Sequence, residues 1–171
     1  MSTLALRGGK PIRETKDFFP TYNSIGKEEK DAVARVMDSG VLSTYIGVWH
    51  KDFYGGPIVR AFEEEWAKKF QVKHAVAMNS ATSALIASVG ALGIGPGDEV
   101  IVSPYTMVAS VSCVLWWGGK PVFADVEPDY FCLDPKSVEA VITPRTKAII
   151  VVDIFGGAYD ADALGAIAKK H

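Results

Sequence analysis

A polar segment between two apolar stretches carries the first side chains that could bind a charged ligand. Residues 79–83 read Asn-Ser-Ala-Thr-Ser, directly after a predicted strand over 74–78 and at the start of a predicted helix. In an open α/β sheet, ligands bind at the carboxyl ends of the strands. The first amides of a helix attract phosphate, and the hydroxyls of Ser80, Thr82 and Ser83 add donors. We therefore expect an anion site here; the alternative is that Ser80 or Thr82 only caps the helix.

This segment differs from the common phosphate-binding loops. No Gly-Lys-Ser/Thr sequence follows it, as a P-loop would require, and it contains no glycine of a Gly-x-Gly-x-x-Gly turn. The glycine-rich turn at 93–97 lies between a helix and the next strand, and we interpret it as a tight connection. An unrelated doubly wound nucleotide binder would need a glycine-rich first turn, so we rank that class of protein last.

Three further loops follow apolar strands and offer side chains for a ligand. The loop at 103–107 reads Ser-Pro-Tyr-Thr-Met, and either Tyr105 or Met107 could lie against a flat ligand. The alternative for both residues is packing in the core or on the surface. Asp125 and Asp153 each stand at the end of a later strand, where a carboxylate either meets a ligand or caps the next loop.

Helices and strands alternate along the part of the chain that would position these residues. Helices are predicted over 24–39, 57–70, 82–92, 106–117, 135–142 and 160–170, and strands over 74–78, 99–103, 120–124 and 147–153. Strands that are apolar throughout, separated by helices, indicate an α/β domain with a mostly parallel sheet covered on both faces. Pro57 suits a first helical position, and Asp134 suits an N-cap. Residues 1–23 show no clean period and are predicted to form an extended arm.

Composition excludes several classes of protein. The chain has 171 residues, 49% of them hydrophobic, and a net charge of −2, which argues against disorder and against nucleic acid or an anionic membrane as partner. Cys113 and Cys132 form no ligand pattern with the histidines, so we predict buried thiols and no metal site. The longest apolar stretch, 107–117, is too short to span a membrane. We expect a soluble cytoplasmic protein.

Six strings stand in an order and spacing that point to one family. They are Ser-Gly-Val-Leu-Ser at 39–43, Val-Arg-Ala-Phe-Glu at 59–63, Asn-Ser-Ala-Thr-Ser-Ala-Leu at 79–85, Ala-Leu-Gly-Ile-Gly-Pro-Gly-Asp-Glu-Val-Ile-Val at 91–102, Pro-Val-Phe-Ala-Asp-Val at 121–126 and Ile-Thr-Pro-Arg-Thr-Lys-Ala-Ile-Ile at 142–150. Together they resemble the DegT/DnrJ/EryC1/StrS aminotransferases, which modify sugars and use pyridoxal 5'-phosphate (PLP). The resemblance covers about 25–171, nearly the whole chain.

The resemblance implies a fold of the aspartate-aminotransferase type (fold type I), in which a large α/β domain precedes a small C-terminal domain. Residues 24–171 would then be the N-terminal part of the large domain. Members of the family are usually homodimers with active sites at the subunit boundary. They move an amino group from a glutamate-type donor to a keto-sugar, typically nucleotide-linked, for polysaccharide or secondary-metabolite biosynthesis.

The resemblance also assigns roles to individual residues around the cofactor. Ala81 and Thr82, next to Ser80, match the segment that binds the cofactor phosphate, although glycine is usual at the position of Ala81. Met107 matches the residue that stacks on the cofactor ring, which is usually aromatic, and nearby Tyr105 is the alternative. Asp153 stands where many members carry histidine, and we expect it at the cofactor site with its role left open.

The family's chemistry needs a lysine that binds the cofactor covalently and a carboxylate against the pyridine nitrogen. No residue of this chain matches either position, and no serine has a lysine five residues later. We therefore predict that the chain alone cannot transaminate. It would be a fragment of a longer protein, an inert natural truncation, or half of an enzyme that needs a second chain. A non-catalytic module for binding or dimerisation is the alternative function.

Overall fold

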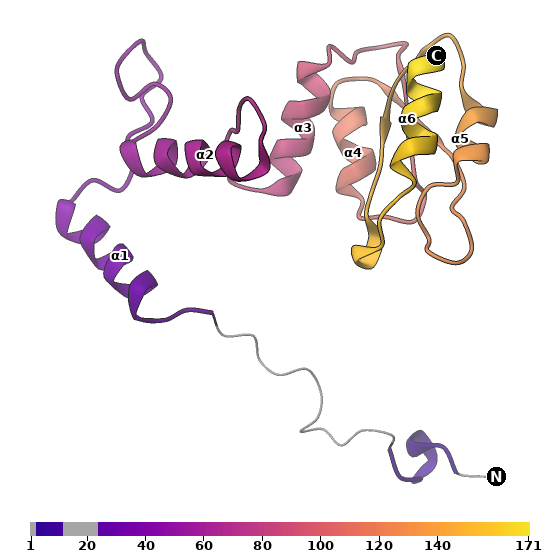
Figure 1. Ribbon diagram of the computed structural model, residues 1–171, viewed down its shortest axis with the longest axis horizontal. Helices are drawn as coiled ribbons and strands as arrows, with labels where there is room; N and C mark the ends of the chain where they lie inside the picture. The colour runs from indigo at the N-terminus through magenta and orange to yellow at the C-terminus, as the bar shows by residue number, and fades with distance from the viewer. Residues whose placement is uncertain (1–2, 12–23) are drawn as a thin grey trace. The chain divides into compact units, whose positions relative to one another are not determined.

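A computed structural model describes residues 3–11 and 24–171 of the chain (Figure 1). Residues 1–2 and 12–23, which belong to the predicted N-terminal arm, lie outside the described residues. The chain divides into two compact units, Met1–Ala75 and Val76–His171. None of the helices in the described ranges is long and apolar enough to cross a membrane.

In its described residues the first unit contains two amphipathic helices and one short 3-10 turn, η1 (Ala5–Arg7). Helix α1 (Lys27–Ser39) begins where the amide of Gly26 donates to the Glu29 carboxylate over 2.7 Å, and it ends at Gly40 with φ of 68°. Helix α2 (Pro57–Phe70) starts at proline, as predicted, because proline lacks only an amide that the first turn does not use. Neither helix has a fully buried residue.

The second unit is an α/β domain built on a parallel sheet. Its elements are α3 (Ala81–Ala91), β1 (Glu99–Val102), α4 (Ala109–Trp116), β2 (Lys120–Phe123), α5 (Pro135–Val141), β3 (Thr146–Ile150), η3 (Ile154–Gly156) and α6 (Ala161–Lys170). The three strands lie in the order β2-β1-β3, and both pairings are parallel. The sheet and its helices confirm the predicted α/β class.

The central strand β1 directs successive side chains to opposite faces of the sheet, and each face has its own core. Val100 packs with residues of α3 and α4, namely Val89, Cys113 and Val114. Ile101 packs on the other face with residues of α5 and α6, namely Val138, Leu164 and Ile167. The sheet is thus covered on both faces, as its apolar strands predicted. Each fully buried aliphatic side chain contributes about 1.5–3 kcal/mol.

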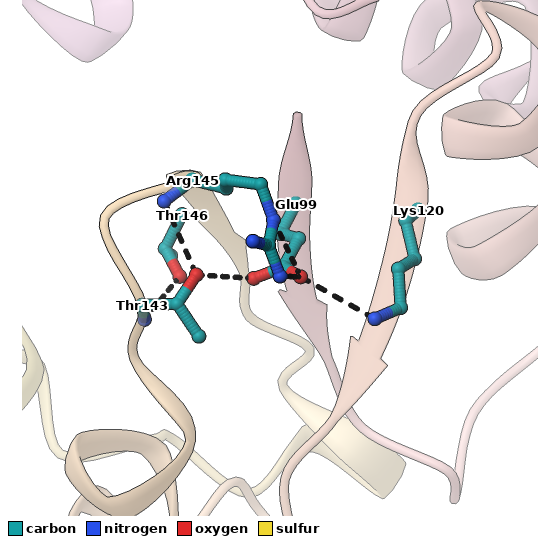
Figure 2. A network of polar contacts seen from close by, with 5 residues as sticks. All are labelled: Glu99, Lys120, Thr143, Arg145 and Thr146. Carbon is teal, nitrogen blue, oxygen red and sulfur yellow. Dashed lines mark hydrogen bonds and ion pairs between the residues drawn. The ribbon is translucent and has the colours of Figure 1, made fainter. Parts of the chain in front are cut away.

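A buried carboxylate joins the three strands at their amino ends (Figure 2). The side chain of Glu99 is 2% exposed and accepts hydrogen bonds from the Thr143 hydroxyl, from Arg145 Nη2 at 2.8 Å and from Lys120 Nζ at 3.3 Å. Hydrogen bonds from Thr143 and then Arg145 lower the pKa of Glu99 to about 2. We call this group the Glu99 clamp; it fixes β1 to both of its neighbours.

Several sequence predictions of local structure were wrong: α1 begins three residues after its predicted start, and β3 ends three residues before its predicted end. Residues 74–78 form no strand, because a strand is defined by ladder bonds to a neighbour and no described strand pairs with this segment. Helix α4 begins at Ala109, three residues after the predicted start. The reason is local: Ser103 Oγ accepts from the Tyr105 amide over 3.0 Å, which folds the preceding residues into a turn.

Candidate cofactor-binding site

The amino end of α3 is both capped and open. Ser80 has an extended backbone, and its Oγ accepts from the Ser83 amide over 3.1 Å and contacts the Ser83 hydroxyl at 3.0 Å. Ser80 is therefore the N-cap that the sequence offered as the alternative. This cap uses the third amide of the helix and leaves those of Ala81 and Thr82, for which a helix supplies no acceptor. Both residues are exposed, so capping and anion binding are compatible here.

The amino end of α3 lies at the carboxyl ends of the strands, which we call the carboxyl edge of the sheet. Its carboxyl end leads through a short turn at 92–98 directly into β1, and Val89 packs against Val100. A helix that returns along the strand it precedes runs antiparallel to it. The first residues of α3 consequently lie on the side of the sheet where β1 ends, as ligand sites in open α/β sheets do.

The loop after β1 brings Tyr105 and Met107 to the same edge. Ser103 is buried, and its hydroxyl also contacts the Tyr105 carbonyl at 3.3 Å, so the loop turns sharply as it leaves the strand. Beyond this turn Tyr105 is 48% exposed and Met107 is 74% exposed. A thioether is polarizable and can cover an aromatic ring, so Met107 has the chemistry that the predicted stacking position needs.

Asp153 follows β3 and shapes the loop behind it. Its Oδ1 accepts from the Tyr159 amide over 3.1 Å, and its carbonyl accepts from the Gly156 amide over 3.1 Å. The carboxylate therefore caps its own loop, which is one of the two roles the sequence allowed. Asp153 remains exposed, so the second carboxylate oxygen can still face a ligand.

Two phenylalanines that sequence reasoning missed surround Tyr105. The ring centroid of Tyr105 lies 5.7 Å from that of Phe131, in the loop after β2, and 6.1 Å from that of Phe155, after β3. We call these three residues the aromatic patch. Both phenylalanines have positive φ, 61° and 53°, a left-handed conformation that is rare for bulky residues. Only their position after a strand could have suggested them from sequence.

The residues present fit the phosphate of PLP but not its covalent attachment. Two amides in the first turn of a helix, both on exposed residues, are donors suited to a phosphate, and the Thr82 hydroxyl adds a third. The three loops that follow the strands, at 103–108, 124–134 and 151–160, contain no lysine. Lys120 belongs to the Glu99 clamp at the opposite edge of the sheet.

Comparison with known proteins agrees with this geometry. Residues 23–171 match the DegT/DnrJ/EryC1/StrS aminotransferase family. The spore coat polysaccharide biosynthesis protein SpsC of Bacillus subtilis is 44% identical over 161 residues, which cover 94% of this chain and 39% of SpsC. The L-glutamine:2-deoxy-scyllo-inosose aminotransferase of Streptomyces kanamyceticus is 38% identical, over 99% of this chain and 38% of its own length. This chain thus spans about two fifths of these relatives.

Solved structures give the same result. The aminotransferase from Psychrobacter cryohalolentis superposes with a TM-score of 0.79 at 40% identity, over 90% of this chain and 36% of that one. S. venezuelae DesV, solved with a ketimine intermediate, superposes with a TM-score of 0.75 at 41% identity, over 84% of this chain and 36% of DesV. This chain belongs to the DegT/DnrJ/EryC1/StrS aminotransferase family.

Proposed function

We propose that residues 24–171 are the N-terminal part of the large domain of a PLP-dependent aminotransferase that acts on a keto-sugar. The observation that supports this most is the open amino end of α3 at the carboxyl edge of a parallel sheet, in a chain of this family. Relatives named for polysaccharide biosynthesis and for inosose amination support a small polyhydroxylated substrate. The proposed substrate is nucleotide-linked, and the proposed amino donor is of the glutamate type.

The chain's own residues would hold the cofactor rather than react with it. The amides of Ala81 and Thr82, with the Thr82 hydroxyl, would bind the phosphate, while Ser80 keeps the first turn in place. Met107 would cover one face of the ring, and Tyr105 would take that role if the thioether does not reach. Bound PLP supplies an electron sink for the bond changes at the substrate's amino-bearing carbon. Asp153 lies at the same carboxyl edge and would offer the cofactor a polar contact.

Catalysis would need a lysine from polypeptide outside these 171 residues. The loops at the carboxyl edge contain none, and no serine is followed by a lysine at the spacing typical of the family. We infer that the chain alone binds PLP reversibly and does not turn over. The same lack of lysine supports the second candidate, a non-catalytic paralogue that binds or dimerises. We further propose that the complete protein is a cytoplasmic homodimer.

Equilibrium dialysis with PLP, together with an amino-transfer assay, tests this proposal. We expect PLP binding that inorganic phosphate competes away, and no amino transfer from glutamate or glutamine to a nucleotide-linked keto-sugar. Thr82→Val removes the hydroxyl at nearly constant shape and should weaken binding about tenfold, since one charge-assisted hydrogen bond is lost. Ser88→Ala, near the other end of α3, is the matched control and should change nothing.

Two outcomes contradict the proposal in different ways. Amino transfer by the chain alone would show that its lysines suffice and would overturn the predicted inactivity. PLP binding that resists phosphate competition and is equal in Thr82→Val and Ser88→Ala would place the cofactor elsewhere and overturn the site.

A further inference from the structure

The aromatic patch leaves three rings open to solvent at the carboxyl edge of the sheet. Tyr105 is 48% exposed, Phe131 45% and Phe155 81%. They follow β1, β2 and β3 respectively, and the ring of Tyr105 is inclined by 53° to that of Phe131 and by 66° to that of Phe155. Rings inclined in this way do not cover one another face to face, so ring faces remain available to a ligand. Exposed apolar groups that gather in one place mark a binding surface.

Hydrogen bonds fix the loops that carry the two phenylalanines. In the loop after β2, the Phe131 amide donates to the Glu127 carbonyl over 3.1 Å, and the Glu127 amide donates to the Cys132 carbonyl over 3.0 Å. The buried thiol of Cys132 donates to the Gly157 carbonyl over 3.4 Å and so joins this loop to the loop after β3. A surface that is held in place before a ligand arrives loses little conformational entropy on binding.

Both phenylalanines keep a bulky side chain where glycine would be accommodated more easily. Their φ values of 61° and 53° are left-handed, a conformation that costs free energy for residues with a Cβ. Phe155 is largely exposed, so burial in the core does not explain its ring. Backbone strain of this kind clusters at ligand-binding sites, where it holds a side chain in a required position.

The loops that form the carboxyl edge carry a negative charge. The ranges 103–108, 124–134 and 151–160 contain no lysine or arginine but six acidic residues, which are Asp125, Glu127, Asp129, Asp134, Asp153 and Asp160. Lys136, the first basic residue after the second range, does not balance them. Lys120 and Arg145 are bound to Glu99 at the opposite edge of the sheet. The surroundings of the aromatic patch therefore favour a cationic ligand over an anionic one.

We propose that the aromatic patch binds an organic ammonium ion. The faces of aromatic rings attract cations through their quadrupole, and a site with several rings selects an ammonium whose carbon substituents also contact the rings. The Asp153 carboxylate, two residues before Phe155, adds negative charge while its Oδ1 accepts from the Tyr159 amide. The amides of Ala81 and Thr82 attract anions, so two parts of one edge would select groups of opposite charge.

The aminated product is the ligand of this kind that the proposed function supplies, and this link alone rests on that function. A protonated amine on a sugar carries the positive charge that the patch selects, whereas the keto-sugar from which it is formed is uncharged at that carbon. The patch would therefore bind the product's amino group more tightly than the substrate's carbonyl. The ammonium site itself is independent of the phosphate site, because it uses neither Ala81 nor Thr82.

Ligand titrations of the 171-residue chain test the site without cofactor or turnover. Choline has a permanent positive charge, and the alcohol in which carbon replaces its nitrogen has the same shape and no charge. In ¹H–¹⁵N NMR spectra at constant ionic strength, we expect choline to give saturable shifts that are largest around Tyr105, Phe131 and Phe155. The uncharged analogue should bind about fivefold more weakly, because it lacks the cation–π attraction. Glucosamine and glucose repeat the comparison on a sugar.

Substitutions of exposed rings separate the patch from general apolar binding. Phe155→Leu keeps an apolar side chain but removes the ring, and should weaken choline binding about fivefold. Phe155→Tyr keeps a ring and should bind as the natural chain does. Trp116→Leu is the matched control, because Trp116 is 72% exposed and stands at the end of α4, just before β2 begins. Circular dichroism checks the folding of each variant, and Phe131→Leu replaces Phe155→Leu if that variant unfolds.

Three results would overturn the proposal. Choline could leave the amides around the patch unchanged. It could bind no more tightly than its uncharged analogue, which would remove the preference for a cation. Phe155→Leu could bind choline as well as Trp116→Leu does, which would place the ligand elsewhere. PLP binding that persists alongside any of these results would leave the proposed cofactor site intact, whereas loss of PLP binding with choline binding retained would overturn the proposed function alone.

Discussion

The amino ends and the carboxyl ends of the sheet's strands, called here its amino edge and its carboxyl edge, differ in how their polar groups are hydrogen-bonded. At the amino edge, the Glu99 carboxylate accepts from Thr143, Arg145 and Lys120, and its side chain is 2% exposed. At the carboxyl edge, the amides of Ala81 and Thr82 stand in an exposed first helical turn. Internal saturation at one edge indicates a structural role, whereas open donors at the other leave room for a ligand. The presence of polar groups alone does not distinguish the two roles; the state of their hydrogen bonds does.

Loss of the Glu99 clamp should have the largest effect on stability. Glu99→Ala leaves a cavity beside β1 and removes the common acceptor of three donors, two from the turn before β3 and one from β2. We expect Tm to fall by several degrees in thermal unfolding followed by circular dichroism, with phosphate binding retained below the transition. Loss of phosphate binding by a folded Glu99→Ala chain would mean that the two edges are not independent.

The clamp also predicts a pH dependence. The pKa of Glu99 is lowered from 4.5 to about 2, so its contribution to stability is complete above pH 4.5 and declines as pH falls toward 2. Tm of the natural chain should therefore drop between these values more than Tm of Glu99→Gln, which has no carboxylate to protonate. Equal pH profiles of Tm for the two chains would exclude the Glu99 clamp as the source of the pH dependence.

The contact between Trp117 and α3 should give the next largest effect on stability. Trp117 Nε1 donates to the Ile86 carbonyl over 2.8 Å, and a Cβ at Gly90 would lie 2.3 Å from the Trp117 ring. Gly90→Ala should destabilise the second unit by about 1–2 kcal/mol, because overpacking outweighs the better helix propensity. Gly165→Ala, at an open helical position, is the control and should stabilise by about 0.5–1 kcal/mol. Chemical denaturation measures both; stabilisation by Gly90→Ala would contradict this packing.

The smallest stability effect belongs to the aromatic patch. Phe155 is 81% exposed and has φ of 53°, where glycine is preferred by about 1 kcal/mol. Phe155→Gly should therefore leave stability unchanged or raise it by up to about 1 kcal/mol, despite losing the contact with Tyr105. Marked destabilisation in chemical denaturation would show that the ring supports the fold, as the Glu99 clamp does, and would weaken the contrast between the edges.

Sequence reasoning succeeded where the signal was local. Both ends of α2 were predicted correctly, and its start is marked by Pro57. The predicted Asp134 cap was confirmed, since the Asp134 carboxylate accepts from the Lys136 amide. The strand over 74–78 failed because strand formation depends on a partner elsewhere in the chain. The Glu99 clamp was missed for the same reason, since Thr143 and Arg145 lie more than 40 residues away.

The same difference between local signals and contacts between distant residues applies to the candidate site. Ser80, Ala81 and Thr82 were predicted from a local pattern, a polar segment at the start of a helix, and the structure places them at the amino end of α3; their binding of phosphate stays a prediction. Phe131 and Phe155 were missed because nothing in the sequence predicts a left-handed phenylalanine. Their proximity to Tyr105 depends on the strand order β2-β1-β3, which the sequence did not specify.

Backbone amide chemical shifts during a titration with inorganic phosphate test the central claim most directly. In two-dimensional ¹H–¹⁵N NMR spectra of the chain, we predict saturable shifts that are largest at Ala81 and Thr82, and a weaker response in Thr82→Val. Shifts that instead concentrate at lysines and arginines, or that leave Ala81 and Thr82 unchanged, would contradict an anion site at the start of α3.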